Sequence, residues 1–307
     1  MIERSDFFGY EKYVIRAGGL AVSVLTLGAA VCSIEYNGRP VALGYGTAQE
    51  YLDCESRAGA IIGRVAGRVA HARFSLGGRE YPLAANDGEN QLHGGPQSFD
   101  KRHWSAEVQC ANRIRFALLS REGDNGYPGA LAAAVSYSVD NDTLRIDFEA
   151  EASADTPFAP TSHIYFNLGG TPDILGTHLA VNAQQYQPLD AAGLPQGAPA
   201  PTAGDYDFSE LRPIGRDYDD CFLLSGKQAA MAEDGGVGVA MRTDFPALVL
   251  YTGAGLSAPL HKSQGFCLEP SFGPDCPNRP DAPILHRGER FHRYAEYRFY
   301  RRSGGQE

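Results

Sequence analysis

The sequence predicts an all-β protein built as a large antiparallel β-sandwich. Hydrophobic and polar residues alternate with a period of two in short segments along the chain, which is typical of strands with one buried and one solvated face. No segment shows a sustained apolar stripe with the helical period of 3.6 residues, so we expect little helix. The 36 glycines and 19 prolines separate these segments, as the turns of a sandwich require.

Individual elements follow from the same pattern. Residues 74–83 predict a hairpin, because the segments FSL and YPL flank a Gly-Gly turn. Residues 135–148 predict a second hairpin, in which VSYSV and LRIDF flank the turn-forming run DND. Residues 114–118 and 247–251 predict further strands, and the apolar residues 18–34 predict a buried strand pair.

The organisation of the chain indicates one domain over residues 1–307. There is no internal repeat, low-complexity linker or compositional break that would mark a boundary. Residues 187–201 are rich in Pro, Gly and Ala, and we expect a long surface loop there.

Composition argues against several classes of partner. The net charge is −10, whereas a nucleic-acid partner needs clustered Lys and Arg, so we expect no nucleic acid. Residues 18–34 contain Ser and Thr and fall short of the roughly 20 apolar residues of a membrane-spanning helix, so we expect no membrane contact.

The cysteines and the start of the chain indicate a cellular compartment. Six cysteines are scattered without a Cys-x-x-Cys pair, which signals neither a zinc site nor a disulfide framework. Residues 1–6 (MIERSD) lack the basic and apolar regions of a signal peptide. We therefore expect a cytoplasmic protein with reduced thiols, as a monomer or homodimer.

Two of the eight histidines stand in unusual surroundings. His93 lies in NQLHGG (residues 90–95), where the glycines allow a sharp turn beside open space that a ligand can occupy. His163 lies in PTSHIYFNL (residues 160–168), among aromatic residues that can stack on the apolar face of a sugar ring.

Six segments in register carry a resemblance to a known family. They are GRVAGRV (63–69), NQLHGG followed by FDKRHW (90–95 and 99–104), GYPG (126–129), TSHIYFNL (161–168), YD (218–219) and FCLE followed by PD (266–269 and 274–275). Over nearly the whole chain this set resembles the aldose 1-epimerase, or galactose mutarotase, family. The spacing between Arg68 and His93 matches the family pattern and selects Arg68, not Arg64, as the site residue.

The resemblance implies a galactose mutarotase-like sandwich that interconverts the α and β anomers of a free aldose. It implies that Glu269 is the general base at the C1 hydroxyl and His163 the general acid at the ring oxygen, with His93 stabilising charge on that oxygen. It further implies that Arg68 and Asp219 hold sugar hydroxyls. An acid and a base suffice for this reaction, so we expect no cofactor and no metal. From ordinary pKa values, activity should fall in acid as Glu269 gains a proton and in alkali as His163 loses one.

Several positions depart from the family pattern, including Cys221 in place of an Asn and Pro-Ser after Glu269 in place of Thr-Gln. Gly67 stands where an Asn is usual, Ser162 replaces the Asn before the histidine, Asp220 replaces a His, and Val249 replaces a Gln. Because the changes at Gly67, Ser162 and Val249 remove hydrogen-bonding groups from places where relatives contact the sugar, we expect loose discrimination between aldoses.

Three other functions compete with this interpretation. The first is a non-catalytic carbohydrate-binding or sugar-sensing protein on the same fold, which has no need of an acid–base pair. The second is a metal-dependent isomerase of the cupin type with His93 and His163 as ligands, although no His-x-His pair with a following Glu is present. The third is a hexose-phosphate epimerase, which favours a basic pocket.

Overall fold

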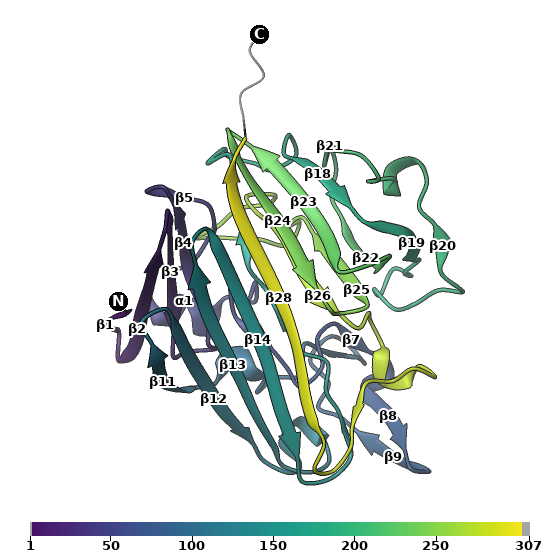
Figure 1. Cartoon of the computed structure of the whole chain (residues 1–307). Helices are drawn as coiled ribbons and strands as arrows, with labels where there is room; N and C mark the ends of the chain where they lie inside the picture. Colours follow the sequence, from purple (N-terminus) through teal and green to yellow (C-terminus); the bar gives the residue numbers. More distant parts are fainter. Residues whose placement is uncertain (1, 303–307) are drawn as a thin grey trace.

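The computed structural model describes residues 2–302, and strands form most of it (Figure 1). All ladders between named strands are antiparallel, as predicted. The one α-helix of the described residues is α1 (Ala48–Asp53), and single 3-10 turns lie at Ala70–Ala72, Phe99–Lys101, Asp124–Gly126, Gly204–Tyr206 and Cys276–Asn278.

The largest sheet has nine strands. In spatial order they are β11 (Ser105–Cys110), β12 (Arg113–Ser120), β13 (Leu131–Asp140), β14 (Thr143–Ala152), β28 (Arg290–Arg301), β24 (Val237–Thr243), β23 (Gln228–Asp234), β18 (His178–Val181) and β21 (Arg212–Pro213). Strand β14 shows the predicted alternation, because Leu144, Ile146 and Phe148 are fully buried while Arg145 is half-exposed.

Two smaller sheets pack against this large one. The first contains β1 (Ile2–Phe7), β2 (Tyr10–Ala17), β3 (Leu20–Leu25), β4 (Val31–Tyr36) and β5 (Arg39–Pro40). The second contains β17 (Tyr165–Phe166), β26 (Phe266–Ser271), β25 (Ala247–Tyr251), β22 (Asp219–Leu224), β19 (Ala183–Gln187) and β20 (Ala200–Pro201). In Figure 1 the first sheet lies to the left of the nine-stranded sheet, and β19 and β20 of the second lie to its right.

Four two-stranded ribbons complete the chain. They are β6 (Ile61–Ile62) with β16 (Thr161–Ser162), β7 (Arg68–Val69) with β10 (Gln91–Leu92), β8 (Arg73–Leu76) with β9 (Arg79–Pro82), and β15 (Thr156–Pro157) with β27 (Ile284–Leu285).

Aromatic side chains join the sheets into one core. Tyr13 of β2 packs edge-on against Phe116 of β12, with ring centroids 6.0 Å apart. Phe166 of β17 contacts Tyr297 of β28 at 5.3 Å, and the Tyr297 hydroxyl donates to the backbone oxygen of Leu268 at 2.9 Å. A buried hydroxyl needs such a partner, so this bond fixes the distance between β26 and the large sheet.

The predicted elements are confirmed. Residues 74–83 form the β8–β9 hairpin, residues 135–148 lie in the β13–β14 hairpin, and residues 18–34 contain β3 and most of β4. Residues 114–118 lie in β12, and residues 247–251 are β25. No helix among the described residues is long and apolar enough to cross a membrane.

Candidate active site

Strand β26 presents two polar side chains on one face. Cys267 and Glu269 are two positions apart and therefore point to the same side of the sheet, whereas Leu268 points into the core. The register places Glu269 beside Val249 of β25, which pairs in turn with Cys221 of β22. A polar candidate for the general base is thus held by a strand whose other face is fixed in the hydrophobic core.

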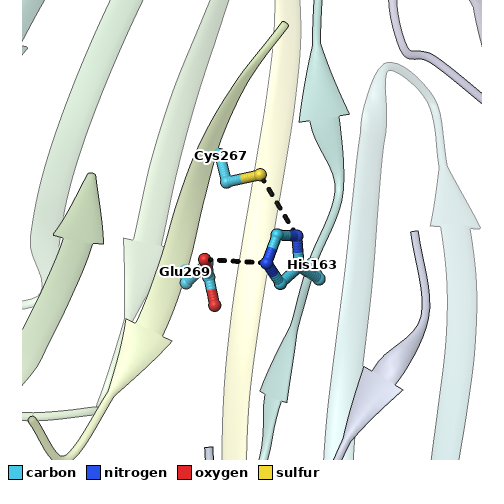
Figure 2. Close-up of side chains that lie close together, drawn as sticks. All are labelled: His163, Cys267 and Glu269. Carbon is cyan, nitrogen blue, oxygen red and sulfur yellow. Dashed lines mark hydrogen bonds and ion pairs between the residues drawn. The ribbon is translucent and has the colours of Figure 1, made fainter. Parts of the chain in front are cut away.

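His163 reaches Glu269 from the short connection between β16 and β17. Its backbone N–H donates to Ala60 at 3.0 Å, and its carbonyl accepts from Gly59 at 2.8 Å. The imidazole Nε2 lies 3.5 Å from Oε1 of Glu269 (Figure 2). Both residues are 5% exposed. The two residues that the resemblance implies as acid and base are therefore in direct contact.

Burial controls the protonation of this pair. Removal from water raises the pKa of Glu269 well above its usual range, and the charge of Asp219 raises it further, while Arg57 acts in the opposite direction. Burial lowers the pKa of His163 to about 3, with the Arg57 cation as a second cause. The expectation from ordinary pKa values, in which the carboxyl loses its proton first, is wrong for the free pair, because burial reverses the order.

His93 lies next to His163, and its own partner fixes its tautomer. The two rings meet edge to face, with centroids 5.6 Å apart. The backbone N–H of Gly67 donates to Nδ1 of His93 at 3.2 Å, so Nδ1 is the acceptor and the ring proton resides on Nε2. Burial holds the pKa of His93 well below 6.5. His93 is therefore a neutral donor.

The glycine after His93 is required by a close backbone approach. Gly94 has φ +86°, and a Cβ there would lie 2.0 Å from the carbonyl oxygen of Gly63. This contact explains the His-Gly pair of the sequence motif, since a side chain at this position would displace the loop.

Arg68 and Asp219 form one wall of the pocket. Arg68 Nε donates to Asp87 Oδ2 at 2.7 Å, and its Nη1 lies 3.9 Å from Asp219 Oδ2. Sequence reasoning missed Asp87, the partner that orients the guanidinium. The Asp219 side chain is 59% exposed, so its carboxylate is open to a ligand.

Arg64 has a different role. It is almost completely buried, and its guanidinium donates to the hydroxyls of Ser120 and Thr156 and to backbone oxygens of residues 120, 121, 128 and 129. All of these bonds tie loops of the scaffold together. The structure therefore agrees with the choice of Arg68 over Arg64 as the pocket-lining arginine.

The candidate active site is a pocket of about 260 Å³. This volume is close to the lower end of the roughly 300–1,000 Å³ that small-molecule sites have. The five predicted site residues all line it. Arg57, Tyr165 and Tyr251 also line it, and sequence reasoning did not select them. Tyr165 stands in the aromatic segment after His163 and could have been found from it, whereas Arg57 carries no motif signal.

The departures from the family pattern divide into two groups. Gly67, Asp220 and Val249 line the pocket. Ser162 does not, because it precedes His163 in extended backbone, points away from the pocket and is fully buried. The expectation that Ser162 affects sugar contacts is therefore wrong.

Residues 188–199 form the predicted loop, whereas Gln187 ends β19 and Ala200–Pro201 form β20, so the predicted bounds of 187–201 are too wide. The loop also contributes to the pocket. Leu189 and Gly193 line the pocket. A Cβ on Gly193 would lie 2.4 Å from Nη1 of Arg68, so the absence of a side chain there leaves room for the guanidinium.

His163, Cys267 and Glu269 are the one group in residues 2–302 whose ligand atoms could hold a metal ion, since these atoms lie within 4.8 Å of one another. Metal binding needs a thiolate and a carboxylate. Burial raises the pKa of both Cys267 and Glu269 well above the usual values. Burial thus disfavours the deprotonated forms of Cys267 and Glu269 that a metal ion would need.

Comparisons with known proteins identify the family of this chain. The family model for Aldose 1-epimerase matches residues 11–298. Galactose mutarotase from Sus scrofa is 33% identical over 313 residues, which cover 92% of this chain and 91% of the mutarotase. Aldose 1-epimerase from Escherichia coli K12 is 33% identical over 319 residues, which cover 92% of each protein.

Solved structures show the same fold. Galactose 1-epimerase from Lactobacillus acidophilus superposes with a TM-score of 0.90 at 28% identity, over 99% of both chains. An aldose epimerase homologue from C. elegans gives a TM-score of 0.90 at 24% identity, over 95% of this chain and 100% of that one. The all-β sandwich and the resemblance drawn from the sequence motifs are both confirmed, and the chain belongs to the aldose 1-epimerase family.

Proposed function

We propose that this protein interconverts the α and β anomers of a free aldose, with Glu269 as the general base and His163 as the general acid. The observation that carries the proposal is the 3.5 Å contact between these two buried side chains at the pocket. The anomeric hydroxyl oxygen and the ring oxygen are bonded to the same carbon, C1. A base and an acid in mutual contact can therefore reach both oxygens at once.

Ring opening moves two protons. Transfer of the pair's one proton from Glu269 to Nε2 of His163, across their 3.5 Å contact, gives the reactive carboxylate and imidazolium. Glu269 then takes the proton of the C1 hydroxyl, and Nε2 of His163 gives its proton to the ring oxygen. The bond between C1 and the ring oxygen breaks, its electron pair stays on that oxygen, and C1 becomes a carbonyl carbon. Rotation about the bond between C1 and C2 and reversal of the same steps give the other anomer. The pair ends with the number of protons it had at the start.

The neighbouring residues support charge and orientation in this scheme. Neutral His93, with its proton on Nε2, donates to the ring oxygen as negative charge develops there. Arg68 and Asp219 hold sugar hydroxyls through charge-assisted hydrogen bonds, which are directional enough to fix the ring. Proton exchange uses only these side chains, without a cofactor.

The pocket charges favour a neutral monosaccharide over a sugar phosphate. Four acidic residues line the pocket, namely Glu55, Asp219, Asp220 and Glu269, against two arginines, Arg57 and Arg68. A doubly charged phosphate needs a surplus of cationic donors. A purely binding protein, in turn, has no use for a buried acid–base pair that costs solvation energy.

Polarimetry tests the proposal. Freshly dissolved α-glucose and α-galactose should change optical rotation much faster with the protein than without it, and the 6-phosphates should not be preferred. Binding of free sugar in calorimetry, without acceleration of mutarotation, would support the carbohydrate-binding alternative instead.

A further inference from the structure

The proposed mechanism leaves one contact of His163 unused. Nδ1, the ring nitrogen opposite the one that faces Glu269, lies 3.4 Å from Sγ of Cys267 (Figure 2). We propose that Cys267 is a positioning residue, whose sulfur accepts the Nδ1–H of His163 and so leaves Nε2 as the nitrogen that receives and gives the transferable proton. This inference rests on the proposed function of His163 as the acid.

The geometry of β26 makes this contact specific. Cys267 and Glu269 project from the same face of one strand and flank the two nitrogens of a single imidazole. The register fixes Cys267 between Tyr165 of β17 and Tyr251 of β25. Cys267 is fully buried, so water does not reach Nδ1 of His163 from the side on which the sulfur lies.

The chemistry of the acid requires a proton on Nδ1. When the imidazolium gives its Nε2 proton to the ring oxygen, the neutral ring that remains must carry its one proton on Nδ1. A buried N–H without an acceptor is destabilising, and the Cys267 sulfur is the side-chain acceptor within reach of Nδ1. Histidines in other sites are held by a carboxylate or carbonyl in the same way.

A thiol suits this role because it is a weak acceptor. A carboxylate at this position would stabilise the imidazolium and make it a poorer acid toward an ether oxygen. Burial keeps the Cys267 thiol protonated, since its pKa lies well above the usual value. The sulfur therefore orients the ring without stabilising its charge.

Other groups around His163 do not replace this contact. The rings of His93, Tyr165 and Tyr251 lie 5.6, 4.9 and 6.1 Å from the His163 ring, centroid to centroid. Arg57 contributes a positive charge that disfavours the imidazolium. The Tyr165 hydroxyl donates to the backbone of Ser56 instead.

Two substitutions of Cys267 separate acceptor strength from packing. Cys267→Val fills the site with an apolar side chain, and Cys267→Ser provides a stronger acceptor. We expect Cys267→Val to lower kcat roughly tenfold or more with little change in KM, and Cys267→Ser to retain most of kcat. The acid limb of the pH profile should move to lower pH in Cys267→Val and to higher pH in Cys267→Ser. Cys276→Val and Cys276→Ser are the matched controls, because Cys276 is equally buried but lies in a separate cluster with Phe74 and Tyr127.

Nitrogen NMR tests the proposal without reference to activity. In protein labelled with ¹⁵N-histidine, the His163 signals are identified by their absence from His163→Asn. We expect the neutral His163 of the unaltered chain to carry its proton on Nδ1, and Cys267→Val to shift the population toward the Nε2 tautomer. A proton on Nε2 in the unaltered chain, or pH limbs that coincide in Cys267→Val and Cys267→Ser, would overturn the proposal. Failure of the unaltered chain to accelerate mutarotation would instead contradict the proposed function.

Discussion

Nε2 of His163 lies 3.5 Å from Oε1 of Glu269, and neither side chain is appreciably exposed to water. At this separation the two groups titrate as a pair, and their apparent pKa values belong to both. Burial disfavours the doubly protonated pair, which is positive, and the fully deprotonated pair, which is negative. The pair therefore keeps one proton over a wide pH range.

The plot of kcat/KM against pH should therefore have a broad plateau. Activity falls in acid when the pair gains a second proton, and burial places this step well below pH 6.5, since the pKa of His163 is lowered to about 3. Activity falls in alkali when the pair loses its remaining proton, at a pH well above the usual range of a carboxyl group. An acid limb near pH 6.5 would contradict the burial argument.

The charges of Asp219 and Arg57 should shift the acid and alkaline limbs of the pH profile in different ways. Asp219→Asn removes a negative charge that raises the pKa of Glu269, so the alkaline limb should move to lower pH while the acid limb stays. Arg57→Met removes a cation that lowers the pKa of both Glu269 and His163, so both limbs should move to higher pH. Measurement of kcat/KM against pH for the two variants checks this. Unchanged limbs would show that these charges do not affect the pKa values of Glu269 and His163.

The two arginines of the motif should separate stability from binding. Arg64→Met leaves several buried acceptors without a donor and should lower the free energy of unfolding by about 3–5 kcal/mol. Arg68→Met loses a partly exposed ion pair and should cost at most about 1 kcal/mol in stability. It should raise KM by roughly 10-fold, because a charge-assisted hydrogen bond to the sugar is lost. Denaturant unfolding and steady-state kinetics check both, and equal stability losses would contradict the assignment.

Gly67 offers a direct test of sugar discrimination. Its φ is +77°, and a Cβ there meets Pro274 only at ordinary contact distance, 3.6 Å. Asn tolerates this backbone region better than most residues, so Gly67→Asn should fold and add an amide to the pocket. We expect a modest ratio of kcat/KM between the two best aldoses in the unaltered chain, and a change of roughly 5-fold in Gly67→Asn. Gly67→Ala is the control without the amide, and an identical change in both variants would attribute the effect to backbone strain.

Removal of metal ions should leave activity unchanged, because the acid and the base are both side chains. Exhaustive chelation followed by polarimetry checks this. Loss of activity that zinc or manganese restores would mean that His163, Cys267 and Glu269 hold an ion rather than exchange protons.

Local patterns predicted the hairpins but not the sheet order. The β13–β14 hairpin follows from alternation and a turn, which are encoded within residues 135–148. The pairing of β14 with β28 joins segments far apart in sequence, and no local signal encodes it. Neighbouring side chains in extended backbone point to opposite sides, so Ser162 faces away from the side that His163 occupies. This rule alone, applied to the sequence, excludes Ser162 from the sugar contacts.

The site was predictable where a motif carried it. Glu269 and His163 stand in recognisable segments, but their contact depends on how β26 lies beside the β16–β17 connection. The reversed order of their pKa values and the sulfur at Nδ1 depend on burial and ring orientation. The spacing of residues in the sequence determines neither the burial of these groups nor the orientation of the ring. Arg57 belongs to no motif, and only its position in the wall of the pocket identifies it as a candidate site residue.

Substitution of the base and the acid tests the central claim most directly. Glu269→Gln keeps the size of the side chain and most of its hydrogen bonding but removes the base, so kcat for mutarotation should fall roughly 10²–10⁴-fold with little change in sugar affinity. His163→Asn should cost a similar factor, and the double variant should lose much less than the product of the two, because the residues act as a unit. Polarimetry of all three variants, corrected for spontaneous mutarotation, gives these rates. Near-normal activity of Glu269→Gln would contradict the account and direct attention to Asp219 as the base.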